Sequence, residues 1–171
     1  MVRVSAETGS AEGGAPARFR ALVAEVEAPL RRALVAAYGP DLGREAAADA
    51  LGWAWEHFAR VEAMENPAGY LYRVGQSSAR RAFRRAGRER SWDGALVASN
   101  GGDDRPPVEP ALLPALARLT PNQRSAVLLV HGYRYTLAEA AAIHGCHVST
   151  LRNHLARGMA SLRLTLGVTD A

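Results

Sequence analysis

Apolar residues recur every three or four positions along most of the chain, which is the spacing of one face of an α-helix. This spacing predicts a first helix over about 17–38, which the Gly39-Pro40 pair ends. A second helix is predicted over about 42–61, and a third runs from Pro67 into an arginine-rich stretch. On one side of the second helix lie Ala47, Leu51, Trp55 and Phe58, whereas Trp53 points elsewhere.

Shorter helices, three or four of them, are predicted between about 111 and 166. Thr120 and Gln123 form a capping box around Pro121, and Thr136 and Glu139 form the start of another helix. The one run typical of a strand, AVLLV at 126–130, directly follows the first of these signals, so we interpret it as a buried helix. The sequence therefore predicts an all-α protein.

A stretch without apolar periodicity separates the two sets of helices. Residues 87–110 are rich in Gly, Pro, Asp and Ser, a composition that is typical of a flexible linker. We therefore expect two small helical domains on a tether. The expected division is a disordered tail at 1–16, a first domain at 17–90, a linker at 91–110 and a second domain at 111–167.

The composition indicates the charge of a possible partner and the cellular compartment of the protein. The chain has 171 residues and a net charge of +4, and much of its apolar fraction of 48% is alanine, which predicts thin cores. All of its 21 basic residues are arginine, and seven of them fall between Arg73 and Arg90 against one acid, Glu89. This local excess suggests an anionic partner. A single cysteine and the absence of a signal peptide or a long apolar run predict a cytoplasmic protein.

Residues 136–163 have the dimensions of a helix-turn-helix, with a short capped helix, Gly145 in the turn and a longer helix from Val148. The apolar stripe of the longer helix is Val148, Leu151, Leu155, Met159 and Leu162. Its other side presents Ser149, Thr150, Arg152, Asn153, Ala156 and Arg157. Arginine and asparagine can contact guanine and adenine edges in the major groove, and short hydroxyls can reach phosphates. The alternative is an ordinary solvated face, but the capped helix and turn glycine that precede it favour DNA binding.

The stretch NPAGYLYRVGQSSARRAFRRAGRER, 66–90, mixes aromatic residues with arginines. Single-stranded nucleic acid favours such a mixture, because bases stack on rings while guanidinium groups hold the backbone. In the alternative interpretation Tyr70, Leu71 and Val74 belong to a core and the arginines are solvated. From the residues alone, both remain open.

Metal and catalytic chemistry find little support in the sequence. His131, His144, Cys146, His147 and His154 are close in sequence, but they lack the paired spacings of a zinc site. We expect these histidines in turn capping and solvent contact. No nucleophile–base–acid set and no glycine-rich phosphate loop stands out, so we predict a protein that is not an enzyme and has no cofactor or metal.

Two independent groups of motifs carry a resemblance to a known family. NPAGYLYRV with ARRAFRR, followed after the linker by LARLTPNQR, TLAEAAAIHG and STLRNHLARG, resembles bacterial RNA polymerase sigma factors of the extracytoplasmic-function group. Residues 17–90 look like sigma region 2, and about 110–166 look like region 4. The resemblance implies a promoter-specificity subunit that binds RNA polymerase core and promoter DNA, both double-stranded and melted. It also implies an anti-sigma protein as a partner and no contact with a membrane.

The resemblance also implies roles for individual residues. In the family, region 4 reads the −35 element, and region 2 docks on polymerase and opens the −10 element, capturing a flipped base in a loop that here is 61–69. The expected −35 contacts are Ser149, Thr150, Arg152, Asn153 and Arg157. The expected −10 contacts are Asn66, Tyr70, Arg73, Arg80, Arg81, Arg84 and Arg85. The expected polymerase contacts are Glu45, Asp49, Trp53 and Glu56, in a stretch that lacks the family's usual glutamine.

A stand-alone helix-turn-helix regulator is the alternative function. Such a protein would use residues 136–163 without polymerase. It would need a ligand pocket or a dimer interface in its first domain, and the arginine run offers neither.

Overall fold

The computed structural model describes residues 14–85 and 111–167. Helix α1 (Ala15–Tyr38) begins two residues earlier than predicted, since Pro16 is accommodated in its first turn. The last residues of the predicted tail therefore belong to α1. Its residues 1–13 lie outside the described part of the chain. The predicted linker at 91–110 also lies outside it.

The predicted second helix is in fact two helices. Helix α2 (Pro40–Glu56) ends at His57, whose backbone φ of −120° departs from helical geometry, and α3 (Phe58–Glu62) follows. Helix α4 (Pro67–Arg85) starts where the sequence predicted. Asn66 caps it, because its Oδ1 accepts a hydrogen bond from the Gly69 N–H at 2.9 Å.

The second segment contains α6 (Leu112–Arg118), α7 (Pro121–Val127), a π-helical turn η2 (Leu128–Gly132), α8 (Leu137–His144) and α9 (Val148–Leu166). The predicted capping box at Thr120 with Gln123 is confirmed, and the predicted helix start at Thr136 with Glu139 is confirmed and is also a capping box. The run at 126–130 is helical, as interpreted from the sequence. Across the two described ranges no residue forms a strand, so the all-α prediction is confirmed.

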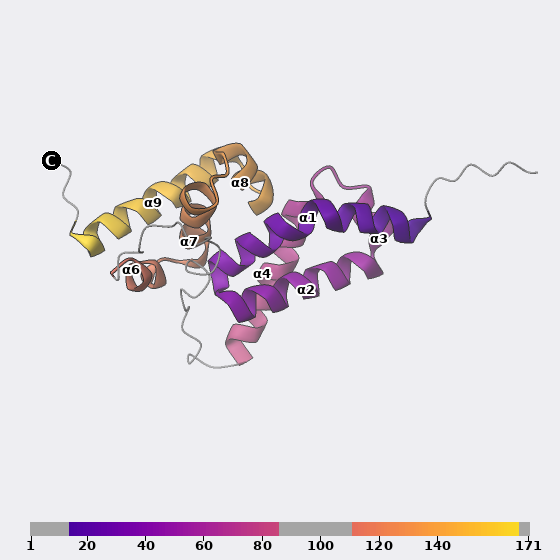
Figure 1. The fold of residues 1–171 in the computed structure, drawn as a ribbon, viewed down its shortest axis with the longest axis horizontal. Coiled ribbons are helices and arrows are strands. Elements are labelled where there is room, and N and C mark those ends of the chain that lie inside the picture. The colour runs from indigo at the N-terminus through magenta and orange to yellow at the C-terminus, as the bar shows by residue number, and fades with distance from the viewer. Residues whose placement is uncertain (1–13, 86–110, 168–171) are drawn as a thin grey trace, which may run out of the picture.

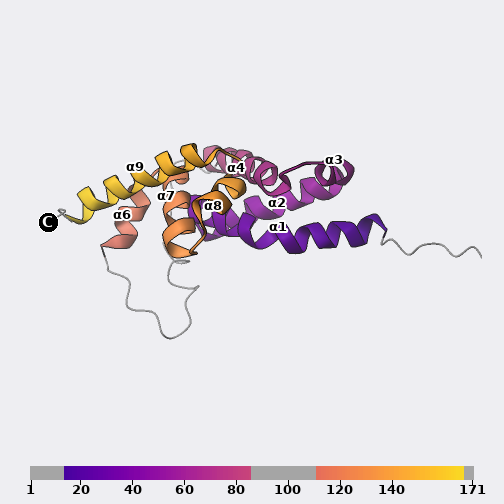
Figure 2. The same ribbon diagram turned by 90° about the horizontal axis from the view of Figure 1, so that it is seen from above.

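The helices form an elongated body (Figures 1 and 2). Helices α1, α2 and α4 pack against one another, and α3 lies at their far end. Helices α6 to α9 gather at the opposite end, where α7 packs on α1 and α8 packs on α4. The two segments on either side of residues 86–110 are thus in direct contact, an arrangement that the sequence left open.

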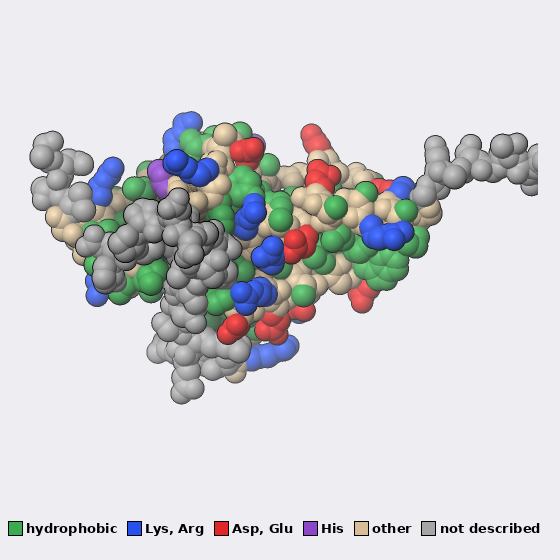
Figure 3. Space-filling view, viewed as in Figure 1, with side chains coloured by type: hydrophobic (Ala, Val, Ile, Leu, Met, Phe, Trp, Pro, Cys, Tyr) green, Lys and Arg blue, Asp and Glu red, His purple; other side chains and the backbone are tan. Residues whose placement is uncertain are grey.

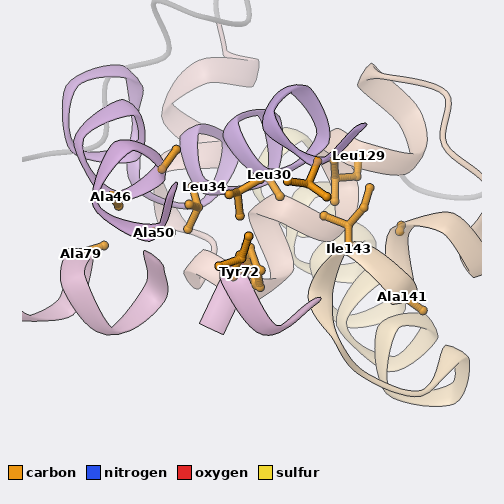
Figure 4. Close-up of a cluster of buried hydrophobic side chains, with 14 of the residues drawn as sticks. Leu30, Leu34, Ala46, Ala50, Tyr72, Ala79, Leu129, Ala141 and Ile143 are labelled. Atoms are coloured by element: carbon orange, nitrogen blue, oxygen red, sulfur yellow. The ribbon is translucent and has the colours of Figure 1, made fainter. Parts of the chain in front are cut away.

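One hydrophobic cluster extends across both segments (Figure 4). Leu30 and Leu34 of α1 meet Tyr72 of α4, and Leu129 and Ile143 reach the same cluster from the second segment. Each of these five side chains is at most 5% exposed. A smaller cluster lies within the second segment, formed by Ala115, Leu116, Leu119, Val127 and Leu162.

The core is thin, as the alanine content predicted. The buried side of α2 carries Leu42, Gly43, Ala46, Ala47, Ala50 and Ala54. Trp55 is 52% exposed, and it meets Phe19 of α1 with ring centroids 4.9 Å apart. Val148, predicted in the apolar stripe of α9, is 38% exposed because it lies in the first turn, beyond the packed part of that helix. Within the described ranges, no helix has the length and apolar character needed to span a bilayer.

Candidate nucleic-acid interface

Helices α8 and α9 form the predicted helix-turn-helix. Gly145 ends α8 with a φ of 60° and a ψ of 38°, the left-handed conformation that glycine adopts without steric cost. Its N–H donates to the Ala142 carbonyl at 3.0 Å, and the Cys146 N–H donates to the Ala141 carbonyl at 3.0 Å. These bonds close α8 and allow α9 to start three residues after Gly145.

The outward side of α9 is open to solvent. Leu151, Gly158 and Leu162 are the buried residues of the helix, and they define its packed side. All of the predicted −35 residues are exposed on the remaining surface: Ser149, Thr150, Arg152, Asn153 and Arg157. Ala156 is exposed among them and keeps this surface low. A helix of this shape can enter a major groove and place donors against base edges.

The predicted −10 residues divide into two groups along α4. The arginines of its second half, Arg80, Arg81, Arg84 and Arg85, are all exposed. The residues at its start face the helix-turn-helix instead. Asn66 donates from Nδ2 to the Ala142 carbonyl at 2.9 Å, and the Arg73 guanidinium donates to the Gly145 carbonyl.

An aromatic cluster connects α2, α3 and α4 beside these residues. The Trp53 ring stacks on His57 at 4.2 Å between centroids and lies 5.3 Å from the Tyr70 ring. The Arg60 guanidinium lies 5.6 Å from the Tyr70 ring centroid and 6.0 Å from that of Trp53. This is the combination of ring faces and positive charge on which an unstacked base can rest.

The comparisons with known proteins agree with this geometry. Residues 111–162 match the family model described as Sigma-70, region 4, and they contain the whole helix-turn-helix. Sigma-70 region 4 is thus the family that this segment of the chain matches. The predicted resemblance of about 110–166 to sigma region 4 is confirmed by this match.

A solved structure shares the fold of this chain over both segments. It is the sigma factor RpoE from Bartonella quintana, in a co-crystal structure with the anti-sigma factor NepR. The match has a TM-score of 0.58 at 21% sequence identity and covers 90% of this chain and 99% of that one. No curated protein matches in a sequence comparison.

The predicted polymerase-binding residues lie along α2. Glu45, Asp49 and Glu56 are exposed, and the Ser78 hydroxyl of α4 donates a hydrogen bond to Asp49 Oδ2. Trp53 is half-buried against Tyr70, so it lies closer to the predicted −10 residues than the sequence indicated. Figure 3 shows one face of the molecule, on which arginines are interspersed with acidic and apolar side chains.

Sequence reasoning missed a set of buried polar residues that joins the two segments. Arg124 of α7 is 6% exposed, and its guanidinium donates to the Ala37 carbonyl of α1 at 3.0 Å and to the Leu119 carbonyl at 2.7 Å. The Ser125 hydroxyl donates to the Ala33 carbonyl of α1 at 3.1 Å. Burial lowers the pKa of Arg124 to about 10.

His144 belongs to the same joint, and the expectation that it contacts solvent is wrong. It is 7% exposed, its Nε2 lies 3.0 Å from Ser125 Oγ, and its ring lies 4.6 Å from that of Tyr72. Burial lowers its pKa to about 4, and His154 contributes in the same direction. The imidazole is therefore neutral at pH 7. No three His, Cys, Asp or Glu side chains of the described residues are grouped as metal ligands.

Proposed function

We propose that this protein is a sigma factor of the extracytoplasmic-function group, a promoter-specificity subunit of RNA polymerase. It reads its promoter at two separate places, with the outward side of α9 on the −35 duplex and α4 with its preceding loop on the melted −10 strand. The observation that supports this most strongly is the exposure of Ser149, Thr150, Arg152, Asn153 and Arg157 on one side of α9. We also propose the domain limits expected from the sequence, 17–90 and 111–167, with the provision that α1 begins at Ala15.

At the −35 element, Arg152 and Asn153 are the proposed base readers. An arginine can donate two hydrogen bonds to guanine, and an asparagine can pair with adenine in the same way. Ser149 and Thr150, in the first turn of α9, lie where hydroxyls and backbone N–H groups can hold a phosphate. Arg157 lies two turns further along and contributes charge to the same groove.

At the −10 element, stacking and charge act together. Asn66, Tyr70 and Arg73 form the proposed site for the unpaired strand, with Trp53 and Arg60 adding a ring and a cation beside Tyr70. The exposed Arg80, Arg81, Arg84 and Arg85 would follow the phosphate backbone. Unstacking a base costs a few kcal/mol, so binding at both elements is needed to hold the duplex open.

The proposed polymerase contacts are the exposed acids of α2, namely Glu45, Asp49 and Glu56, together with the accessible edge of Trp53. An anti-sigma protein is a further proposed partner, since the sigma factor of similar fold was solved with one. We propose a cytoplasmic protein that acts by binding alone, without catalysis or a cofactor.

The test is promoter-dependent initiation with purified bacterial polymerase core. Promoters selected from genomic fragments bound by the complete holoenzyme should give transcripts that core alone does not produce. Transcription of equal strength by core alone would contradict the proposal. A footprint of the free protein on one duplex site, without affinity for core, would favour a stand-alone regulator.

A matched pair of tryptophans tests the role of α2 and α4. Trp53→Ala should weaken binding of a −10 single strand by the holoenzyme by about tenfold, because one stacked base is worth about 1–3 kcal/mol. Trp55→Ala should leave it unchanged, since Trp55 lies against Phe19 instead of Tyr70. Equal effects of the two variants would remove Trp53 from the proposed site.

A further inference from the structure

The loop that leads into α8 contains an unusual backbone conformation. Arg134 has a φ of 64°, and among the described residues it is the one residue other than glycine with a positive φ. The Cβ of an arginine is crowded in this left-handed region, which glycine and asparagine adopt far more readily. Residues held in such a conformation are concentrated at functional sites. The loop therefore carries an arginine where the backbone alone favours a smaller residue.

Two tyrosines, one on each side of this residue, fix the conformation. The Tyr133 N–H donates to the Leu128 carbonyl at 2.8 Å, and the Tyr135 N–H donates to the Leu129 carbonyl at 3.0 Å. The Arg32 guanidinium of α1 donates to the Tyr135 hydroxyl at 2.8 Å and lies 5.5 Å from the centroid of the Tyr133 ring. The strained backbone is thus held by contacts of its neighbours rather than by its own side chain.

The side chain of Arg134 is exposed. Within 14–85 and 111–167, no residue forms a hydrogen bond or an ion pair with its guanidinium. Neither packing nor pairing inside the described chain therefore requires an arginine at this place. A guanidinium is suited to binding phosphate or carboxylate groups, which points to an anionic group outside the protein.

The position of the loop in the helix-turn-helix indicates which anion this is. When the second helix of such a motif enters the major groove, the first helix lies across the DNA backbone. Helix α8 has eight residues and is about 12 Å long, and the major groove is also about 12 Å wide. One end of α8 adjoins the start of α9 at Gly145, so its other end lies near the border of the groove. Arg134 precedes the N-cap Thr136 at that end by two residues.

The start of α8 cannot bind a phosphate by its backbone alone. A helix N-terminus attracts phosphate through unpaired N–H groups, but here a capping box uses them. Thr136 Oγ1 accepts from the Glu139 N–H at 3.2 Å, and Glu139 Oε2 accepts from the Thr136 N–H at 2.8 Å. These hydrogen bonds lower the pKa of Glu139, so its carboxylate is ionised at neutral pH and repels a phosphate. Attraction at this end of α8 must therefore come from Arg134.

We propose that Arg134 contacts a DNA phosphate at the border of the −35 groove and anchors the helix-turn-helix from outside α9. The inference rests on the proposed function, because it takes α9 as the helix that enters the −35 groove. A contact with the DNA backbone adds affinity without base preference. The strained turn holds the arginine where this contact is made.

Charge variants test the inference in the complete holoenzyme, on a duplex that carries the −35 element and ends before the −10 element. Loss of one phosphate contact lowers the slope of log affinity against log salt by about 0.9. Arg134→Gln should show this decrease and bind about three- to tenfold more weakly, whereas Arg134→Lys should keep the slope. Arg20→Gln, which removes an exposed charge near the start of α1, is the control and should also keep it. An unchanged slope in Arg134→Gln would overturn the inference.

A glycine variant separates the contact from folding. Arg134→Gly removes the charge and the strain together, because glycine adopts this φ without steric cost. It should unfold at a urea concentration no lower than that of the unsubstituted protein, and it should still bind the duplex as weakly as Arg134→Gln. Unchanged affinity of Arg134→Gly for the duplex would overturn the inference.

Neutral methylphosphonate groups locate the phosphate. Replacing the phosphates that border the −35 groove one at a time should reveal a position at which the unsubstituted protein loses affinity and Arg134→Gln loses none. Equal losses of the two proteins at every position would overturn the inference. Arg152→Ala distinguishes this failure from failure of the proposed function: if its base preference changes while Arg134→Gln keeps the salt slope, only the inference fails. An unchanged base preference in Arg152→Ala would contradict the proposed function itself.

Discussion

Two surfaces proposed to contact DNA differ in how they are presented. All of the predicted −35 residues on the outward side of α9 are exposed. The start of α4, in contrast, is hydrogen-bonded to the turn of the helix-turn-helix. Both surfaces carry arginine and asparagine, so composition does not distinguish them. The difference shows that availability for DNA depends on how the two segments pack, and the predictions below test each side of this contrast.

The largest expected effect comes from the joint between the segments. Arg124→Met should lower the free energy of unfolding by about 3 kcal/mol, because several buried carbonyls would lose a charged donor. Urea denaturation followed by circular dichroism measures the change. The exposed Arg118→Met is the matched control, for which we expect a change within about 0.5 kcal/mol. Equal stability of the two variants would show that Arg124 does not hold the joint.

The next effect concerns the exposed surface. Arg152→Ala should cost about 1–3 kcal/mol in promoter binding and relax selectivity at one or two −35 positions. Arg163→Ala, on the same side of α9 but three turns away, should leave base preference unchanged. Binding to a set of −35 duplexes with single base changes measures both. An unchanged preference in Arg152→Ala would exclude it as a base reader.

Acid should weaken the joint through His144. Because its pKa is about 4 in the folded protein and near 6.5 when unfolded, the neutral form is favoured by folding. The stabilisation is present above pH 6.5 and is lost as the pH falls toward 4, by about 2 kcal/mol between pH 7 and pH 5. His144→Gln should lose this part of the pH dependence, as measured by urea denaturation at both pH values. If the free energy of unfolding depended on pH identically in the two proteins, this role of His144 would be contradicted.

The smallest effect concerns the exposed half of α4. Arg84→Gln with Arg85→Gln should weaken binding of open promoter DNA regardless of its sequence, and it should reduce the salt slope by roughly 1 per lost phosphate contact. Affinity measured over a range of salt concentrations gives the slope. Arg44→Gln, an exposed charge on α2, should leave it unchanged. A slope unaffected by the double variant would mean that these arginines are merely solvated.

Local signals predicted much of the fold correctly. The capping boxes at Thr120 and Thr136, the turn at Gly145 and the start of α4 at Pro67 all depend on residues within four positions of each other. The break between α2 and α3 at His57 was not predicted, because no proline or glycine marks it. The apolar face of α2 was also only partly predicted, since alanines instead of Trp55 make its buried side.

Tertiary contacts decided what local patterns could not. Arg124, Ser125 and His144 were polar residues on short helices, and nothing in their neighbourhood predicted that α1 would cover them. Arg60 and His57 joined Trp53 and Tyr70 because α2, α3 and α4 converge there.

By itself, the sequence determined where the capped helices α4, α7 and α8 begin, and it determined that one side of α9 would be polar, since both follow from periodicity and hydrogen bonding within a few residues. The packed form depended on contacts such as that between Asn66 and Ala142, which are 76 positions apart. Whether such surfaces meet depends on the shapes of complete helices and on the groups that become buried together. Only the tertiary structure contains that information.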